Sequence, residues 1–502
     1  MKRWIFALTL LAVIRVAATN RVFSATHDEP AHLSAGYEWL NGSYSVDLSH
    51  PPLARALCAF PLWLQSNRAP QEGNVIDRLN DLLYRGRYEK NLARARYGTL
   101  LILIAAILGV AAWTRHAFGD VTAIVAVALF TNLPPILGHA GVATTDLAVA
   151  AAFPWALLAL ERYLAQPTLA RGALLGLAIG CGVLAKFSFL VYFPPAALIV
   201  LLMRRPLRAN VRSAALVIVA ALLIIWSGYR FEFAKASTVM GDDGALALFR
   251  LLMPESIAQK AVQVPLPAVS LPLGLAMVRW HDQQPNVSYL LGETGSSWWF
   301  YFPVVLFFKT PLPFLVLFAC GLRRPAWMFA LITLAILAVA MTSHINIGVR
   351  HVLPFYVPAS IVAAYGLTRL HRAAAAALAL WLVIGVAIGH PDYLAWFNEA
   401  AGRDPSRIVV DSNLEWGQDG LRLARVVREL HIDHLKLFYA TNLRLPEHGV
   451  DAERLSFGPQ SGWIAVGEAP LRFFGKPEMF GWLQYYRPVR RVGKSVRLYH
   501  IP

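Results

Sequence analysis

The sequence predicts a mainly α-helical membrane protein, built as a bundle of about eleven transmembrane helices with a small α/β domain at its C-terminal end. Composition is the first reason, because 57% of the 502 residues are hydrophobic and only 15% are charged. A soluble domain averages about 45–50% apolar and about 25% charged residues. The second reason is a series of long apolar runs that stops near residue 390. Both features indicate a chain that crosses a bilayer several times.

Eleven apolar runs have the length of about 17–25 residues that a membrane-spanning helix needs. They lie near 4–24, 95–113, 119–138, 146–164, 171–186, 188–203, 211–230, 298–320, 325–342, 352–370 and 373–390. The fifth and sixth runs lie close together, so the number of spans is approximate. Prolines inside several runs predict kinks, which neighbouring helices in a membrane can accommodate.

The first apolar run has two interpretations. Lys2-Arg3 before it and Phe23-Ser24-Ala25 after it resemble a signal peptide with a small-residue cleavage site. We favour a retained helix, because the acidic residues that follow would otherwise lose their membrane anchor.

Loop charge predicts the orientation. With the N-terminus in the cytoplasm, every inside segment carries Lys or Arg, as the positive-inside rule requires. These segments are Met1-Lys2-Arg3, Arg115, Arg162 to Arg171, Arg204 to Arg212, Arg323-Arg324 and Arg369 to Arg372. The short outside loops are poorer in cations, with Lys186 and Arg350 as exceptions. We therefore expect a multi-pass protein of the inner or plasma membrane. Two long loops, 25–94 and 231–297, and the C-terminal region would then be extracytoplasmic.

The soluble segments carry their own patterns. The first outside loop contains two short amphipathic stretches. Ala31 to Leu40 has apolar residues at helical spacing, and Leu53 to Leu64 is apolar enough to lie along the membrane interface. After residue 390 the pattern changes to short strands and one helix, which predicts two domains, 1–390 in the membrane and 391–502 outside it. The expected strands are 408–410, 435–439, 463–466 and 496–501, and the expected helix is 420–430.

Charge and cysteine content exclude other classes. The formal net charge is +16, but the arginines lie mainly in short loops between apolar runs, so we expect no nucleic-acid partner. The three cysteines form no CxxC pair and no Cys/His zinc spacing, so a disulfide framework and a structural zinc site are not predicted.

Two motifs of the first outside loop carry the most chemical information. Asp28-Glu29 follows the first apolar run, and paired carboxylates at a membrane surface can act as a base or hold a cation. The simpler interpretation is an acidic loop in which Asp28 caps the next helix. In Asp47-Leu48-Ser49-His50-Pro51-Pro52-Leu53, the prolines stiffen the backbone and hold His50 at the start of a new element.

Together these motifs resemble the GT-C glycosyltransferases that use a polyprenyl-phosphate sugar donor. The pattern is similar to that of protein O-mannosyltransferases and their bacterial relatives, which include the aminoarabinose transferases of lipid A. One residue more separates Asp47 from His50 here than in mannosyltransferases. Further matches are Thr144-Thr145-Asp146, Ser288 to Glu293 before Trp298-Trp299, His344 to Pro354, and Phe397 to Asp419. The resemblance covers about residues 1–420 and implies a GT-C-type bundle.

The resemblance also implies roles for individual residues. Asp28 would be the catalytic base that deprotonates an acceptor hydroxyl, Glu29 would assist it, and Asp146 would lie near the donor or acceptor sugar. The implied partners are a polyprenyl-phosphate sugar, the lipid bilayer, and an acceptor that is a protein, a lipid or a glycan. Direct displacement of the lipid phosphate would invert the anomeric configuration. Whether a divalent metal cation takes part is left open.

Positive groups on the outside are candidates for binding the donor phosphate. Arg350-His351 lies in a short outside loop, and the arginine fork suits a phosphate; the alternative is an interfacial pair that reaches toward water. Lys309 lies within an apolar run, so it should face the bundle interior and contact either the phosphate or an internal carboxylate. Three further residues complete the expected substrate-binding set: His50, Lys186 and Glu293.

The segment Asp411 to Asp419 is densely polar but lacks the spacing of an EF-hand. For it we expect a structural or acceptor-facing role rather than a metal site.

The leading hypothesis is thus an inverting glycosyltransferase, and the alternative is a transporter or flippase. A third possibility is a non-catalytic membrane protein that binds sugars or assembles a complex. Transporters place their polar sites near the bilayer midplane, often between inverted repeats, and no repeat is visible here. Convergence of Asp28, His50, Asp146 and Arg350 on one cavity would favour the enzyme.

Overall fold

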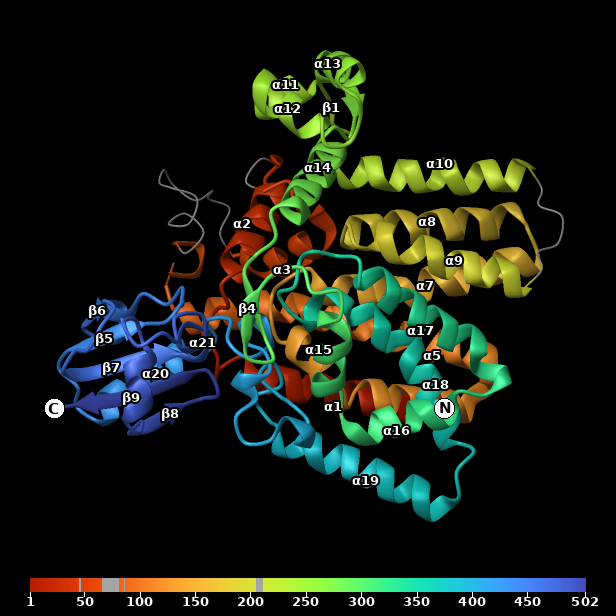
Figure 1. The fold of residues 1–502 in the computed structure, drawn as a ribbon. Coiled ribbons are helices and arrows are strands. Elements are labelled where there is room, and N and C mark those ends of the chain that lie inside the picture. Colours follow the sequence, from red (N-terminus) through yellow and green to blue (C-terminus); the bar gives the residue numbers. More distant parts are fainter. Residues whose placement is uncertain (45–46, 66–80, 85, 205–210) are drawn as a thin grey trace.

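The computed structural model describes residues 1–44, 47–65, 81–84, 86–204 and 211–502. Figure 1 shows a bundle of helices, a smaller domain with a sheet at one end of it, and a small helical unit that projects from its side. Parts of two predicted segments, 66–80 in the first outside loop and 205–210 in a basic inside segment, lie outside the described residues.

Each of the eleven predicted apolar runs contains a helix. The helices of the bundle are α1 (Lys2–Thr19), α5 (Tyr88–Phe130), α6 (Pro134–Ala140), α7 (Asp146–Ala165), α8 (Leu169–Ala185), α9 (Phe189–Arg204), α10 (Val211–Gly228), α15 (Tyr301–Lys309), α16 (Leu312–Gly321), α17 (Trp327–Ala340), α18 (Tyr356–Leu367) and α19 (Arg372–Ile388). Within α5 the chain turns at Gly119, whose φ of 80° lies in the region that favours glycine, at the predicted boundary between the second and third runs.

The predicted number of spans is not confirmed. By length and composition, three of the described helices can cross a membrane: α5, α7 and α10. A fourth span would combine α15 and α16, which are bent by 110° around Pro311. Other apolar helices are shorter, and α1 carries Lys2, Arg3 and Arg15. An apolar run fixes the hydrophobic length, whereas proline and glycine decide where its helix breaks.

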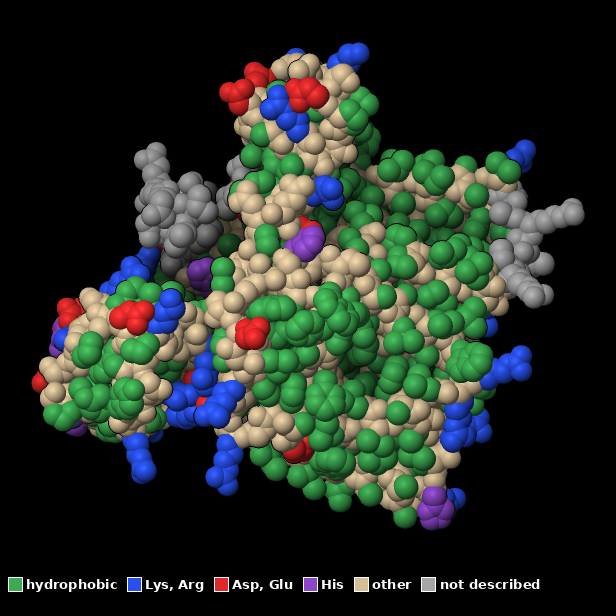
Figure 2. Space-filling model, in the orientation of Figure 1, with side chains coloured by type: hydrophobic (Ala, Val, Ile, Leu, Met, Phe, Trp, Pro, Cys, Tyr) green, Lys and Arg blue, Asp and Glu red, His purple; other side chains and the backbone are tan. Residues whose placement is uncertain are grey.

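The surface of the bundle is apolar. Hydrophobic side chains cover the face seen in Figure 2, whereas charged ones gather on the C-terminal domain and on the projecting unit. Leu202, Val211, Ile218 and Leu222 on α9 and α10 are among the large apolar residues that are exposed. Such a broad apolar surface is expected of helices that face lipid.

The two predicted helices of the first outside loop are confirmed as α2 (Glu29–Leu40) and α3 (Pro52–Trp63). They pack into the core rather than lying on its surface. A Cβ at Gly36 would collide with the backbone carbonyl of Arg55, and one at Gly98 of α5 would collide with that of Leu57. Glycine therefore allows α2, α3 and α5 to approach closely, which fixes the start of α2 against the bundle.

The second long loop is also folded. It contains α11 (Ala236–Met240), α12 (Asp242–Phe249), α13 (Glu255–Gln263) and α14 (Ser270–Gln283). Two antiparallel strand pairs flank these helices, β1 (Phe233–Ala234) with β2 (Leu266–Pro267), and β3 (Ser288–Leu290) with β4 (Glu293–Gly295). The helices α11 to α13 form the projecting unit, and α14 leads back from it toward the bundle (Figure 1).

The C-terminal domain holds a five-stranded sheet in the order β6-β5-β7-β9-β8. Its elements are α20 (Gly420–Glu429), β5 (Leu435–Phe438), β6 (Ala452–Arg454), β7 (Gly462–Gly467), α21 (Glu468–Phe473), β8 (Arg490–Val492) and β9 (Val496–Ile501). β5 runs parallel to both β6 and β7, whereas β9 is antiparallel to β7 and β8. The predicted helix 420–430 and the strands near 435, 463 and 496 are confirmed.

The predicted strand at 408–410 is wrong. Val409 forms a single isolated bridge with Leu290, and Leu291 N donates to Ile408 O over 2.7 Å. The chain then turns at Asp411, so no ladder develops. Short 3-10 turns occur here and elsewhere: η1 (Arg324–Ala326), η2 (Val349–Phe355), η3 (Glu399–Ala401), η4 (Pro405–Arg407), η5 (Asp411–Asn413), η6 (Leu445–His448) and η7 (Gly481–Tyr485).

The polar segment 411–419 is hydrogen-bonded to the segment between α1 and α2. Ser24 N donates to Gln418 O and His27 N donates to Trp416 O, each over 2.9 Å. Ser24 Oγ donates to Gly417 O over 2.8 Å. Residues almost 400 positions apart in the chain are thus joined at the backbone level, directly before Asp28.

Candidate active site

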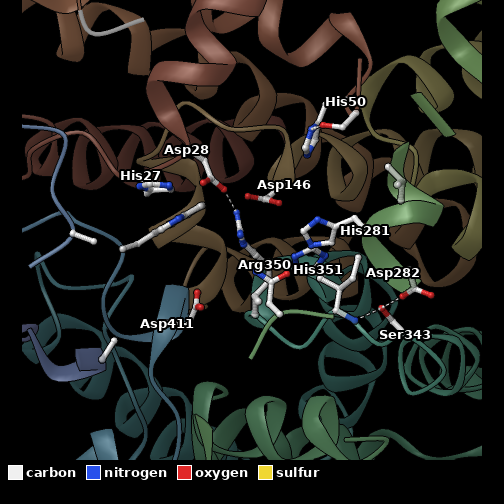
Figure 3. A pocket seen from close by; sticks show the side chains of 18 of the residues that line it. His27, Asp28, His50, Asp146, His281, Asp282, Ser343, Arg350, His351 and Asp411 are labelled. Carbon is white, nitrogen blue, oxygen red and sulfur yellow. Dashed lines mark hydrogen bonds and ion pairs between the residues drawn. The ribbon is translucent and has the colours of Figure 1, made fainter. Parts of the chain in front are cut away.

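A cavity of about 1560 Å³ lies where the bundle, the second long loop and the C-terminal domain meet. Six of the nine predicted site residues line it: Asp28, His50, Asp146, Lys186, Arg350 and His351. Figure 3 shows that Asp28, Asp146 and Arg350 point toward one another, with His50 and His351 nearby. The four residues that were to distinguish an enzyme from a transporter therefore share one cavity.

Asp28 stands immediately before the first residue of α2, and its side chain remains 29% exposed. Its Oδ2 accepts a hydrogen bond from Arg350 Nη1 over 2.5 Å. Burial alone raises the pKa of Asp28, but the positive charge of Arg350 more than offsets this effect, so its pKa lies below the ordinary value. The carboxylate is therefore ionised at neutral pH and can accept a proton.

Arg350 reaches the cavity from η2 and is held on two sides. Its guanidinium lies over the ring of Trp416, with 4.3 Å between Cζ and the ring centroid. This stacking fixes the plane of the arginine while its edge contacts Asp28. Trp416 in turn belongs to the 411–419 segment that is hydrogen-bonded to the backbone before Asp28.

A second ion pair faces the same cavity. Lys186, which ends α8, donates from Nζ to Asp146 Oδ1 over 2.5 Å. The other oxygen of Asp146 accepts a hydrogen bond from Thr144 Oγ1 over 2.9 Å. Since Asp146 begins α7, its charge also lies at the positive end of a helix dipole.

The motif around His50 is organised by Arg55, which sequence analysis did not single out. Arg55 is ion-paired with Asp47 and donates to His32 Nδ1 over 3.0 Å. Asp47 also accepts from Ser49 N over 2.8 Å, so its carboxylate holds the turn rather than facing the cavity. His50 Nδ1 lies 2.9 Å from Ser49 Oγ. Burial lowers the pKa of His50, so the imidazole is neutral at neutral pH.

His351 shares the electrostatic character of His50. Burial, together with the positive charges of Lys186 and Arg350, lowers its pKa well below the ordinary value. Its backbone carbonyl accepts from Tyr192 of α9 over 3.0 Å, which holds η2 against the bundle. The two histidines thus offer neutral polar groups, and the positive charge comes from Arg350 and Lys186.

Three predicted site residues do not line this cavity. Glu29 is fully buried and accepts hydrogen bonds from Arg96 Nε and Nη2 over 2.8 and 2.7 Å. It also accepts from the backbone amides of Thr26 and Ala143 over 2.7 and 2.8 Å. All of its acceptor capacity is directed to the protein. Its contacts are those of a residue that positions the Asp28 loop.

Lys309 is fully buried, as expected of a residue that faces the bundle interior, and it does not line the cavity. Its Nζ donates to the backbone carbonyls of Leu394 and Asn413 over 2.8 and 2.7 Å and lies 4.3 Å from the centroid of the Phe397 ring. A buried ammonium needs acceptors, and these two backbone carbonyls supply them. Glu293 lies on β4 with an exposed side chain.

Several residues of the cavity were not among the predicted site residues. They include His27, His281 and Asp282, together with Asp411 and Trp416 from the segment for which a structural or acceptor-facing role was expected. The signal for Asp411 and Trp416 was the density of polar residues between 411 and 419. Nothing in the sequence pairs Trp416 with Arg350, because that contact depends on the fold.

No group of three or more His, Cys, Asp or Glu side chains is arranged to hold a metal ion within the described ranges. Two carboxylates of the cavity, those of Asp28 and Asp146, each lie beside a cation. This arrangement can deprotonate a hydroxyl and can balance the charge of a phosphate.

Comparisons with known proteins support the resemblance noted from the motifs, through a family model over part of the chain and through the fold of solved structures. Residues 88–228 match the family model described as dolichyl-phosphate-mannose-protein mannosyltransferase. The chain is also similar over its whole length to ArnT from Cupriavidus metallidurans. The apo structure of ArnT matches with a TM-score of 0.53 at 13% identity, and coverage is 99% of this chain and 98% of ArnT. The structure of ArnT bound to undecaprenyl phosphate gives 0.51 at 14% identity, with the same coverage.

A weaker match is to the oligosaccharyltransferase AglB from Archaeoglobus fulgidus in complex with an inhibitory peptide and a dolichol-phosphate. Its TM-score is 0.45 at 17% identity, and coverage is 85% of this chain and 58% of AglB. No protein with a curated description matches the sequence significantly.

Proposed function

We propose that this protein is an inverting glycosyltransferase that moves a sugar from a polyprenyl phosphate to an extracytoplasmic hydroxyl group. The observation that carries the proposal is the convergence of Asp28, His50, Asp146 and Arg350 on one cavity. Asp28 is the base, Asp146 a sugar-facing carboxylate, and Arg350 and Lys186 the cations. Glu29 positions the loop of Asp28.

In the proposed reaction the acceptor hydroxyl gives its proton to a carboxylate oxygen of Asp28. The acceptor oxygen then attacks the anomeric carbon of the donor sugar. The bond between that carbon and the phosphate oxygen breaks, and its electron pair leaves with the polyprenyl phosphate. A single displacement inverts the anomeric configuration. A base positioned in this way typically contributes about 10²–10⁴-fold in rate.

The cations of the cavity favour departure of the phosphate. Arg350 and Lys186 are each balanced by one carboxylate before the donor binds. As the leaving phosphate gains charge, these cations are already in place beside it. Charge stabilisation of this kind is often the largest single contribution to an enzymatic rate.

One side of the cavity is apolar and suits the lipid part of the donor. Leu190 and Val191 of α9, with Leu275, Met277 and Val278 of α14, line this side. ArnT has been crystallised with undecaprenyl phosphate. By analogy, we expect a polyprenyl chain to lie between α9 and α14 and to reach the bilayer there.

The proposal includes the orientation expected from loop charge. The N-terminus is cytoplasmic, and the cavity and residues 391–502 are extracytoplasmic, in the inner or plasma membrane. Most of the residues that line the cavity come from segments predicted to be outside, and the rest, such as Leu190 of α9 and Val339 of α17, come from helices of the bundle. This placement is less favourable for the transporter alternative, whose site would be expected near the bilayer midplane.

The test is transfer by the purified protein in lipid nanodiscs, supplied with a panel of labelled polyprenyl-phosphate sugars and extracted cell-envelope material as acceptor. We expect release of polyprenyl phosphate and a product whose anomeric configuration, measured by NMR, is opposite to that of the donor. Retention of configuration would contradict the direct displacement. Movement of labelled lipid between leaflets without cleavage of the sugar would favour the transporter.

A further inference from the structure

In the C-terminal domain, the carboxyl ends of three strands of the sheet point toward the cavity. β9 runs away from the bundle to the C-terminus of the chain (Figure 1). Since β7 is antiparallel to β9, and β5 and β6 run in the direction of β7, these three strands run toward the bundle. Residues at the end of each strand, or just beyond it, line the cavity: Phe438 to Ala440, Arg454, and Ala469-Pro470.

The carboxyl ends of parallel strands are a common place for ligands to bind in other proteins. In open sheets with parallel strands, ligands occupy the crevice beyond the carboxyl ends of the strands. Here that crevice is the part of the cavity between the sheet and Asp28. Apolar side chains of α9, in the bundle, and of α14, in the second long loop, line another part of the cavity. The two sides therefore differ in chemistry as well as in position.

The side formed by the C-terminal domain combines aromatic rings with charged groups. Phe438, Phe473 and Phe474 contribute rings, and Glu453 and Arg454 contribute charges. Arg454 lies over the ring of Phe438, with Cζ 5.4 Å from the ring centroid. Aromatic faces pack against the apolar faces of sugar rings, and carboxylates accept hydrogen bonds from hydroxyl groups.

Asp411 stands between this side and the ion pair of Asp28 with Arg350. Figure 3 shows it at the edge of the cavity, apart from Asp28 and Asp146. Its φ is 59°, a conformation that few residues other than glycine adopt. One carboxylate oxygen accepts from Ser412 N over 2.5 Å. Backbone strain of this kind is often kept where a side chain serves function.

Its neighbours in the segment are engaged by the protein. Asn413 accepts from Val349 N, Gln418 donates to Leu414 O, and Glu415 accepts from Ala469 N. Glu415 also lines the cavity, but its carboxylate is held by the amide of Ala469, whereas the hydrogen bond described for the Asp411 carboxylate comes from the adjacent residue, Ser412. The side chains of Asn413, Gln418 and Glu415 therefore make contacts within the protein, whereas the carboxylate of Asp411 has capacity left for a ligand.

We propose that the acceptor is a carbohydrate that lies against the C-terminal domain, with Asp411 accepting hydrogen bonds from its hydroxyl groups. This inference rests on the proposed function and adds the class and the place of the acceptor. The sugar could be part of a free glycan or of a glycolipid headgroup, since both present the same hydroxyl chemistry. Asp411 is an acceptor-binding residue, and Asp28 remains the base.

The experiment uses the full chain in nanodiscs with a labelled polyprenyl-phosphate sugar that it cleaves. Three probes serve as acceptors: an octyl glycoside, a free trisaccharide and a Ser/Thr peptide. Asp411→Asn and Asp411→Gly both tolerate the positive φ, so both should fold. Each should raise the KM for the sugar acceptor about 10-fold or more, while the donor KM stays within about 2-fold. His431→Asn is the matched control, because His431 also has a positive φ of 49° but does not line the cavity.

The outcomes separate the two proposals. Transfer to the octyl glycoside indicates a glycolipid, transfer to the trisaccharide indicates a glycan, and either result supports the inference. Use of the peptide alone overturns it. An unchanged acceptor KM in the Asp411 variants, or an equal rise in the donor KM, also overturns it. If the wild-type protein cleaves the donor to water but transfers to no sugar, only this inference fails. If it cleaves no donor at all, the proposed function fails and the inference falls with it.

Discussion

Asp28 and Glu29 are adjacent in the sequence, but their carboxylates lie in opposite surroundings. Asp28 faces the cavity, is 29% exposed and pairs with Arg350. Glu29 is completely buried and accepts hydrogen bonds from Arg96 and two backbone amides. The comparison teaches that charge and position in a motif do not assign a role. The number of donors already directed at a carboxylate decides whether it can still take a proton.

The largest effect is expected when the base itself is neutralised. Asp28→Asn should lower kcat for sugar transfer by about 10²–10⁴-fold, because an amide cannot accept the proton. The melting temperature should stay close to that of the wild type, since the residue is partly exposed. Asp120→Asn is the control, because Asp120 is exposed and pairs with Arg115 away from the cavity. Full turnover by Asp28→Asn would remove Asp28 as the base.

The second prediction concerns the buried partner of Glu29. Arg96→Met leaves the carboxylate of Glu29 uncompensated and should destabilise the protein by about 3–5 kcal/mol, the usual cost of breaking a buried ion pair. Thermal unfolding in detergent, followed by tryptophan fluorescence, measures this loss. The double variant Glu29→Gln/Arg96→Met should recover part of it. If Arg96→Met unfolded at the wild-type temperature but lost sugar transfer, the Glu29–Arg96 pair would have a role in the reaction rather than in stability.

A third change tests the geometry of the Asp28–Arg350 pair without removing its charge. Arg350→Lys keeps a cation but loses the planar fork and the stacking on Trp416. We expect kcat/KM to fall about 10- to 100-fold, because one charge-assisted contact in a fixed plane is lost. Trp416→Phe, which retains a ring, should have a smaller effect. Equal activity of Arg350→Lys and wild type would show that only the charge matters.

The smallest expected effect is on the pH profile. The pKa of Asp28 lies below its ordinary value, so the base is ionised above about pH 4 and is lost only as the pH falls through the shifted pKa. kcat/KM should therefore show no acidic decline due to Asp28 between about pH 5 and 7. In Arg350→Gln the effect of burial is no longer offset, so the decline should move to higher pH. A profile identical to that of the wild type would contradict the pairing.

Much of the architecture could be predicted, because it follows from local patterns. Apolar runs located the helices, and amphipathic spacing located α2, α3 and α20. The number of spans could not be predicted, since the breaks at Gly119 and Pro311 divide or bend helices inside apolar stretches. The strand expected at 408–410 failed because a strand needs a partner, and here the partner is a single residue, Leu290.

Prediction of the site was limited in a similar way. Asp28 was identified through its motif. Arg350 was identified because it is an arginine in a short outside loop, where the positive-inside rule predicts few cations. The distinction between cavity-facing and buried groups was not accessible, because Glu29 and Lys309 depend on partners distant in sequence. No sequence pattern around Arg96 or Leu394 predicts their contacts with Glu29 and Lys309.

The hydrogen bonds that tie Ser24 and His27 to residues 416–418 have a consequence for biosynthesis. The loop that carries Asp28, the proposed base, leaves the ribosome among the first residues, whereas its backbone partners follow nearly 400 residues later. Until they arrive, the carboxylate of Asp28 lacks both the support of that loop and the Trp416 ring behind Arg350. The nascent chain therefore acquires a working centre only at the end of its synthesis, when the bundle is already inserted. Partly made chains would be inactive, so sugar donors would not be consumed before folding is complete.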